Sequence, residues 1–243
     1  MQNRDVTYIL FEENYLAIAC DNSASLGESK YDIVNVDLEI VAEFCLRTPL
    51  LELICVGAKP LAVINTIGNE MFPIGEKIIS GLKKAIKNSP FPDLLLSGST
   101  EENMPSFSTN IGITVVGKID SPPSSNIVPH TKLWLLGELY VGESVLANIE
   151  NIIDYQTVME IMKISGVLDI IPIGSKGILY EASIMAGHKK IFPVFTDESI
   201  NIYESSGPST ALLVATDPEV DLHHRYKQIK LIGEYRDKGE LNA

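Results

Sequence analysis

The most informative segment of the sequence is Leu95-Leu96-Ser97-Gly98-Ser99-Thr100-Glu101-Glu102-Asn103. Its apolar start predicts a strand, and the small residues after it predict a turn that presents hydroxyls, carboxylates and an amide. Such a strand end holds reactive groups on a rigid support and leaves them in solvent. Gly98 allows a positive φ or close approach of a ligand to the backbone, and Glu101 and Glu102 are oxygen ligands of the kind that bind Mg2+. A solvated loop with a Ser/Thr turn is the alternative.

The composition is that of a globular, soluble protein. The residues are 45% hydrophobic and 21% charged. The length of 243 residues is enough for one large domain or two modest ones. No apolar run approaches the roughly 18–20 residues of a membrane span. The start of the chain, Met1-Gln2-Asn3-Arg4-Asp5, has no signal-peptide pattern. We therefore expect no membrane partner.

Charge and cysteine usage narrow the partners further. Nineteen basic and 32 acidic residues give a formal charge of −13, which repels phosphate backbones and makes a nucleic-acid partner unexpected. A nucleotide polyphosphate would need a divalent cation to approach. Cys20, Cys45 and Cys55 lack metal-type spacing and are interpreted as buried thiols of a cytoplasmic protein.

The first 60 residues predict a hairpin and a helix. Apolar runs at 8–11 and 15–20 predict two strands joined at Glu13-Asn14. The second strand would end at Asp21, which is either a metal ligand or part of an Asx-turn or helix cap. The apolar stripe between residues 40 and 54 predicts a helix.

Four residues of this helix region carry specific expectations. Asp37 is a candidate cap, Pro49 should kink or split the helix, and Gly57 should end it. Glu52 is either exposed, paired or bound to a cation, because burial of an isolated carboxylate is costly.

The segments that follow place a second polar turn and a linker. Residues 61–67 predict a buried strand that runs into the turn Gly68-Asn69-Glu70, with a helix opened by Pro73 behind it. Residues 111–117 predict another strand. The Pro- and Ser-rich segment 120–129 predicts a boundary between domains of residues 1–120 and 130–243.

The second half predicts further strands and helices around a glycine-containing turn. Strands are expected at 132–137, 167–171, 211–215 and 229–235, and helices at 155–164 and 178–182. Gly174-Ser175-Lys176 lies between a strand and a helix, so it is either a phosphate cradle or an ordinary turn. It lacks the spacing of a P-loop. His223 and His224 are predicted to lie on the surface.

Taken together, these motifs resemble the superfamily of aminoimidazole-ribonucleotide synthetase, thiamine-monophosphate kinase and selenophosphate synthetase. The resemblance lies in Cys20-Asp21, the helix of residues 47–60, Ser97-Gly98-Ser99-Thr100, and the strands at 113–117 and 231–234. Within this superfamily the chain is similar to the α-ribazole kinases. That similarity lies in Asn69-Glu70-Met71, residues 99–103 and residues 171–182.

This resemblance implies a two-domain α/β (α+β) fold. Residues 1–120 would bind ATP and metal and would dimerise, the two N-terminal halves forming a barrel-like sheet, and residues 130–243 would form an α/β domain. Two family aspartates are missing: Ser99 stands in the place of one, and Ser175-Lys176-Gly177 replaces the turn that carries the other. Glu70, Glu101 and Glu102 are the expected substitutes.

The implied function is an ATP- and Mg2+-dependent kinase that phosphorylates the 5′-hydroxyl of α-ribazole, a nucleoside-like substrate, in cobalamin nucleotide-loop assembly. The alternatives are a thiamine-monophosphate kinase, an ATP-dependent ring-closing enzyme, or a non-catalytic nucleotide-binding scaffold. A homodimer is expected. The candidate residues are Glu70, Glu102 and Lys176 for catalysis; Ser97, Gly98, Ser99, Thr100, Asn103, Gly174 and Ser175 for ATP; and Asp21, Glu52, Glu101 and Glu102 for the metal.

Overall fold

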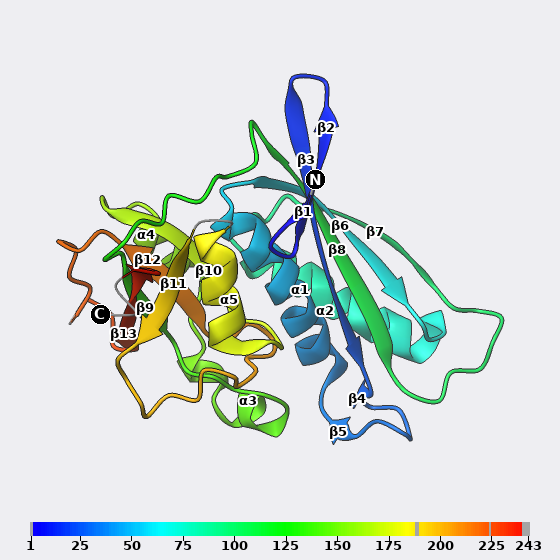
Figure 1. Ribbon diagram of the computed structural model, residues 1–243. Coiled ribbons are helices and arrows are strands. Elements are labelled where there is room, and N and C mark those ends of the chain that lie inside the picture. The colour runs from blue at the N-terminus through cyan, green and yellow to red at the C-terminus, as the bar shows by residue number, and fades with distance from the viewer. Residues whose placement is uncertain (1, 188–189, 224, 240–243) are drawn as a thin grey trace. The chain divides into compact units, whose positions relative to one another are not determined.

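The computed structural model describes residues 2–187, 190–223 and 225–239. Internal contacts divide the chain into two units, Met1–Pro122 and Pro123–Ala243, and the division falls inside the Pro- and Ser-rich segment. Each unit has its own sheet and its own helices (Figure 1). Among the described helices, none is both long and apolar enough to cross a membrane.

The first unit is built on a six-stranded sheet with the order β1-β2-β3-β8-β6-β7. All neighbouring strands are antiparallel except β6 and β7, which are parallel. The strands are β1 (Gln2–Asn3), β2 (Val6–Phe11), β3 (Asn14–Ala24), β6 (Lys59–Ile67), β7 (Leu95–Thr100) and β8 (Asn110–Ile119). A short parallel pair, β4 (Leu26–Gly27) and β5 (Val34–Asn35), lies in the loop after β3.

Helices cover one face of this sheet. Helix α1 (Leu38–Cys55) packs on β3 and β8, and α2 (Glu76–Asn88), preceded by the helical turn η1 (Met71–Gly75), packs on α1 (Figure 1). Asp37 caps α1 as predicted, accepting a hydrogen bond from Glu39 N at 2.7 Å. Gly57 follows the helix with a φ of 76°. The prediction that Pro49 splits the helix is wrong, because α1 runs through it as one 18-residue element.

Two expectations about β3 are also corrected. The strand continues to Ala24, so Asp21 lies inside it rather than at its end. Cys20 is exposed, whereas Cys45 and Cys55 are buried as predicted. The reason is the alternation of a strand, since buried Ala17 and Ala19 put Cys20 on the opposite face of the sheet.

The predicted turn at Ser97–Thr100 forms the last four of the six residues of strand β7. Its residues pair in parallel register with β6, from Ile64 opposite Ser97 to Ile67 opposite Thr100. Gly98 is required by a neighbouring strand, because a Cβ there would lie 2.4 Å from the side chain of Asn65. The close approach predicted at Gly98 is therefore made by the protein's own sheet.

The second unit is an antiparallel five-stranded sheet with the order β10-β12-β9-β13-β11. Its strands are β9 (Lys132–Leu136), β10 (Val167–Pro172), β11 (Ile191–Phe195), β12 (Leu212–Thr216) and β13 (Ile229–Asp237). Its helices are α3 (Glu143–Ala147), η2 (Ile149–Asn151), α4 (Tyr155–Ile161) and α5 (Gly177–Ala186).

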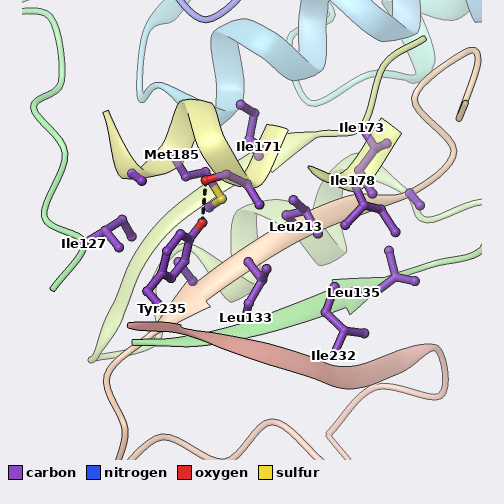
Figure 2. Packing of buried hydrophobic residues seen from close by; sticks show 14 of the residues in the cluster. Ile127, Leu133, Leu135, Ile171, Ile173, Ile178, Met185, Leu213, Ile232 and Tyr235 are labelled. Carbon is purple, nitrogen blue, oxygen red and sulfur yellow. Dashed lines mark hydrogen bonds between the residues drawn. The ribbon is translucent and has the colours of Figure 1, made fainter. Parts of the chain in front are cut away.

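Helix α5 packs on this sheet through one buried cluster. Side chains of β9, β10, β12, β13 and α5 interdigitate there, and the Tyr235 hydroxyl donates a hydrogen bond to the Ala182 carbonyl at 2.8 Å (Figure 2). His223 is half exposed, in keeping with its predicted surface position. His224 lies outside the described residues.

Candidate functional site

The parallel strands β6 and β7 bring two polar segments together where they end. Ile67 and Thr100 are the last paired residues, so residues 68–70 and 101–103 leave the sheet side by side. Glu101 N donates to Ile67 O at 3.0 Å and to Asn69 O at 3.1 Å, which keeps the segments joined beyond the last pair. Three of the predicted site residues, Glu70, Glu101 and Glu102, therefore lie at one end of the first unit's sheet.

Glu102 is fixed by two hydrogen bonds to one of its oxygens. Oε1 accepts from the Met71 backbone N at 2.9 Å and from the Thr100 hydroxyl at 2.6 Å. Met71 begins η1, so the carboxylate takes up a backbone donor that the first turn of a helix leaves free. Glu70, the residue before this turn, is half buried. Glu102 thus ties β7 to η1.

Glu101 is held in its charged form. Its Oε1 accepts from the backbone N atoms of Asn103 and Met104 at 2.7 and 3.1 Å. These donors lower the pKa of the Glu101 carboxyl below its ordinary value, because they stabilise the carboxylate and not the neutral acid. A fixed negative charge therefore remains at this end of the sheet at neutral pH.

Asp21 and Glu52 lie on the helix-covered side of the sheet. Asp21 faces α1, and burial raises the pKa of its carboxyl, while the Asn22 backbone N–H favours the charged form. The Thr48 Oγ1 atom is itself buried, with no hydrogen-bond partner among the described residues. Glu52 is buried one helical turn beyond Thr48. Hard oxygen donors therefore face the interface between β3 and α1.

The strand register separates this group from the β7 end. Asp21 pairs with Ile113, Ile113 with Asn65, and Asn65 with Gly98. Three strand spacings of about 4.8 Å put Asp21 roughly 14 Å from Gly98. Among the described residues, no group of three or more His, Cys, Asp or Glu side chains is gathered closely enough to hold a metal ion. The four predicted metal ligands do not surround one ion within this chain, and their joint role stays a prediction for an assembled, nucleotide-bound site.

The other predicted ATP-binding residues are divided between the two units. Ser97, Gly98 and Ser99 are exposed on β7, the last strand of its sheet. Asn103 follows in the loop. Gly174 and Ser175 precede α5 in the second unit.

Lys176 is the residue before α5, and its ammonium group contacts the ring of Tyr180. Its Nζ lies 3.0 Å from the Tyr180 hydroxyl and 4.1 Å from the centre of that ring. Gly177 begins the helix with a φ of 78°, and a Cβ there would lie 2.8–3.0 Å from the backbone of residues 202–204. The backbone of the predicted cradle is therefore fixed by packing.

Sequence reasoning missed the polar network that fixes the loops around the β7 end. Asp32 accepts hydrogen bonds from Thr109 N, Thr109 Oγ1 and Ser29 N, at 2.7, 2.6 and 2.8 Å. Asn69 donates to Ser108 O and accepts from Asn110 N. Short polar residues at strand ends were the available signal, but all of these partners except Ser29 are 39 to 77 residues away in the chain.

Comparison with known proteins identifies the fold. No protein-family model matches the chain, and no curated protein sequence matches it. Among solved structures, thiamine monophosphate kinase from Aquifex aeolicus is similar over 96% of this chain and 89% of its own, with a TM-score of 0.68 and 13% identity. Hydrogenase maturation protein HypE in complex with ATP gives a TM-score of 0.66 and 14% identity, over 93% of this chain and 78% of its own.

A third structure extends the comparison. Phosphoribosylformylglycinamidine synthase II from Thermotoga maritima gives a TM-score of 0.59 and 14% identity, over 95% of this chain and 36% of its own. The chain thus has the aminoimidazole-ribonucleotide-synthetase-like fold, a mixed α/β fold, as the sequence resemblance implied. One of the similar structures is the Aquifex kinase complexed with AMPPCP and TMP.

The half-buried Asp21 carboxylate leads to a stability prediction. Its raised pKa means that the folded state favours the neutral acid, so this contribution to stability is complete below the unfolded pKa and is lost as pH rises through the folded pKa. Asparagine stays neutral throughout. We expect Asp21→Asn to raise the free energy of unfolding at pH 7 by about 0.5–2 kcal/mol, with a smaller gain at about pH 4.5, as measured by urea denaturation.

The matched control is Asp93→Asn, which changes an exposed aspartate and should leave stability within about 0.5 kcal/mol at either pH. A less stable Asp21→Asn protein at pH 7 would mean that the Asp21 charge supports the fold rather than strains it.

Proposed function

We propose that this protein is an ATP- and Mg2+-dependent kinase that phosphorylates the 5′-hydroxyl of α-ribazole. The observation that carries the proposal is the convergence of Glu70, Glu101 and Glu102 at the ends of two parallel strands, in a fold also found in an ATP-complexed and an AMPPCP-complexed protein. Phosphoryl transfer depends mainly on positioning and charge neutralisation. A strand end that presents fixed carboxylates suits the positioning of the reactants, and a divalent cation would supply the charge neutralisation.

The side chains between β3 and α1 offer oxygen donors of the kind that magnesium prefers. Asp21 offers a carboxylate whose charge is disfavoured by burial, and Thr48 offers a buried hydroxyl that makes no hydrogen bond among the described residues. Glu52, also buried, is the second carboxylate of this group. A cation would offset the cost of the buried charge. When bound, Mg2+ neutralises phosphate oxygens and lets an anionic protein accept an anionic nucleotide.

The chain's own groups would position the reactants. Strand β7 is an edge strand, so half of its backbone N–H groups in residues 97–100 point away from β6 and can donate to phosphate oxygens. Glu70 or Glu102 would accept a hydrogen bond from the attacking hydroxyl and take its proton late, because the transition state is loose.

An ADP-release assay with and without Mg2+ tests the reaction. We expect Mg2+-dependent ADP formation with α-ribazole, and α-ribazole 5′-phosphate as the product by mass spectrometry. Glu102→Gln keeps an acceptor for Met71 N and Thr100 Oγ1 but removes the charge, and it should lower kcat/KM by about 100-fold or more. Glu76→Ala, at an exposed position in the first turn of α2, should leave the rate unchanged.

The same assay separates the second candidate. The similarity to the Aquifex kinase complexed with AMPPCP and TMP favours thiamine monophosphate as the alternative acceptor. ADP formation with thiamine monophosphate and not with α-ribazole would replace the proposed substrate. Nucleotide binding without turnover of either acceptor would favour a non-catalytic scaffold.

The uncovered face of the first unit's sheet supports a homodimer. Ile9, Phe11, Ile64 and Leu95 are exposed on the face of β2, β6 and β7 that α1 does not cover. An apolar sheet face of this kind is typical of an interaction surface. The proposed dimer would join two such faces into the barrel-like sheet that the sequence resemblance implies.

Ile64→Glu tests this dimer. A charge in an apolar interface should convert a species of about twice 26.7 kDa into one of 26.7 kDa, as measured by light scattering after size-exclusion chromatography. Tyr203→Glu, at an exposed site of the second unit, should leave the mass unchanged. A wild-type protein that is monomeric at micromolar concentration would exclude the proposed dimer.

A further inference from the structure

Two aromatic side chains meet in the loops at the β7 end of the first unit. Tyr31 lies in the loop after β3, and Phe107 lies in the loop between β7 and β8. Their rings are edge-to-face, with centroids 6.0 Å apart and an interplanar angle of 73°. The Lys30 ammonium lies 5.2 Å from the Tyr31 ring centre. The pair is contributed by loops 76 residues apart in the chain.

The loops that carry this pair are tied together next to the rings. Asp32, the neighbour of Tyr31, accepts both the backbone N–H and the hydroxyl of Thr109, two residues after Phe107. Thr109 O in turn accepts from Ser25 N at 2.8 Å. Gly27 packs directly against Thr109, because a Cβ at residue 27 would lie 2.5 Å from Thr109 Oγ1. The relative position of the two rings is therefore built into the fold.

The pair also adjoins the candidate site. Ser106, beside Phe107, donates its hydroxyl to Gly68 O at 2.5 Å, and Asn69 donates to Ser108 O at 3.0 Å. Asn69 O accepts from Glu101 N, so a continuous set of hydrogen bonds links the Phe107 loop to the carboxylates that follow β6 and β7.

The rings are placed but not buried. Tyr31 is 57% exposed and Phe107 is 69% exposed, whereas aromatic side chains that stabilise a fold bury most of their area. Met104, in the same loop as Phe107, and Phe72, in η1, are likewise exposed. A rigid, exposed aromatic pair beside a polar site has the features of a stacking surface for a planar ring.

We propose that Tyr31 and Phe107 form a stacking platform for the planar heteroaromatic ring of a nucleoside bound at the β7 end. An edge-to-face pair leaves an open ring face, and every nucleobase offers a matching π-face. The ring belongs either to the acceptor or to the adenine of ATP. This inference rests on the proposed function for its location, and it extends that function by assigning the group that recognises the base.

Direct binding to the full chain tests the platform without requiring turnover. Calorimetric titration with α-ribazole and, separately, with AMPPCP and Mg2+ gives the Kd of each for the wild type, Tyr31→Ala, Phe107→Ala and the aromatic replacement Tyr31→Phe. We expect the alanine variants to weaken one of the two ligands about tenfold, as for loss of one stacked base, and Tyr31→Phe to bind as the wild type does. The ligand whose affinity falls is the one whose ring stacks on the platform.

Phe192→Ala is the matched control, since Phe192 is an exposed aromatic of the second unit; its Kd values and unfolding midpoint should equal those of the wild type. Unchanged affinity of both ligands in Tyr31→Ala and Phe107→Ala, or no binding of either ligand to the wild type, would overturn the platform. Wild-type binding with the expected losses but no ADP formation would reject the kinase and retain the platform. ADP formation by the wild type, with unchanged affinities in both alanine variants, would reject the platform and retain the kinase.

Discussion

The hydrogen-bonded register of β3, β8, β6 and β7 fixes the position of every candidate group in the first unit. One row of this sheet runs from Asp21 through Ile113 and Asn65 to Gly98. Because a shift of one residue would move each side chain to the other face, the same register that buries Ile113 also turns Asp21 towards α1. The two groups of carboxylates, at the β3–α1 interface and at the β7 end, are consequences of this pairing.

The cost of this arrangement is concentrated at Asp21. Its carboxylate is half-buried in a protein with a formal charge of −13, and this burial raises the pKa of the carboxyl, so the fold disfavours the charged form of Asp21. Strain of this kind is often retained where a site needs it. A divalent cation would relieve it and would at the same time admit a nucleotide. The Asp21 carboxylate would then both bind the catalytic cation and lower the stability of the cation-free fold.

Much of the architecture could be predicted from local sequence. The β2–β3 hairpin, the Asp37 cap and the β6 strand followed from patterns that need no distant partner, although the hairpin turn is Glu12-Glu13 and not the predicted Glu13-Asn14. Failures occurred where tertiary contacts prevail over local preference. Residues Ser97–Thr100 have turn propensity, yet pairing with β6 makes them a strand, and the buried surroundings of α1 tolerate Pro49 within the helix. The exposure of Cys20 could have been predicted from its alternation with Ala17 and Ala19 along the strand. The site was less predictable, because Asp32–Thr109 and Asn69–Asn110 are paired by the fold and not by spacing.

The central claim is that Asp21 binds the divalent cation that carries the nucleotide. A crystal structure of the protein with Mn2+ and AMPPCP, with anomalous scattering recorded from the metal, tests this claim directly. We expect a manganese peak within coordination distance of the Asp21 carboxylate, with nucleotide phosphates on the same ion. A nucleotide bound elsewhere, or a metal peak remote from Asp21 while its carboxylate stays packed against α1, would contradict the account.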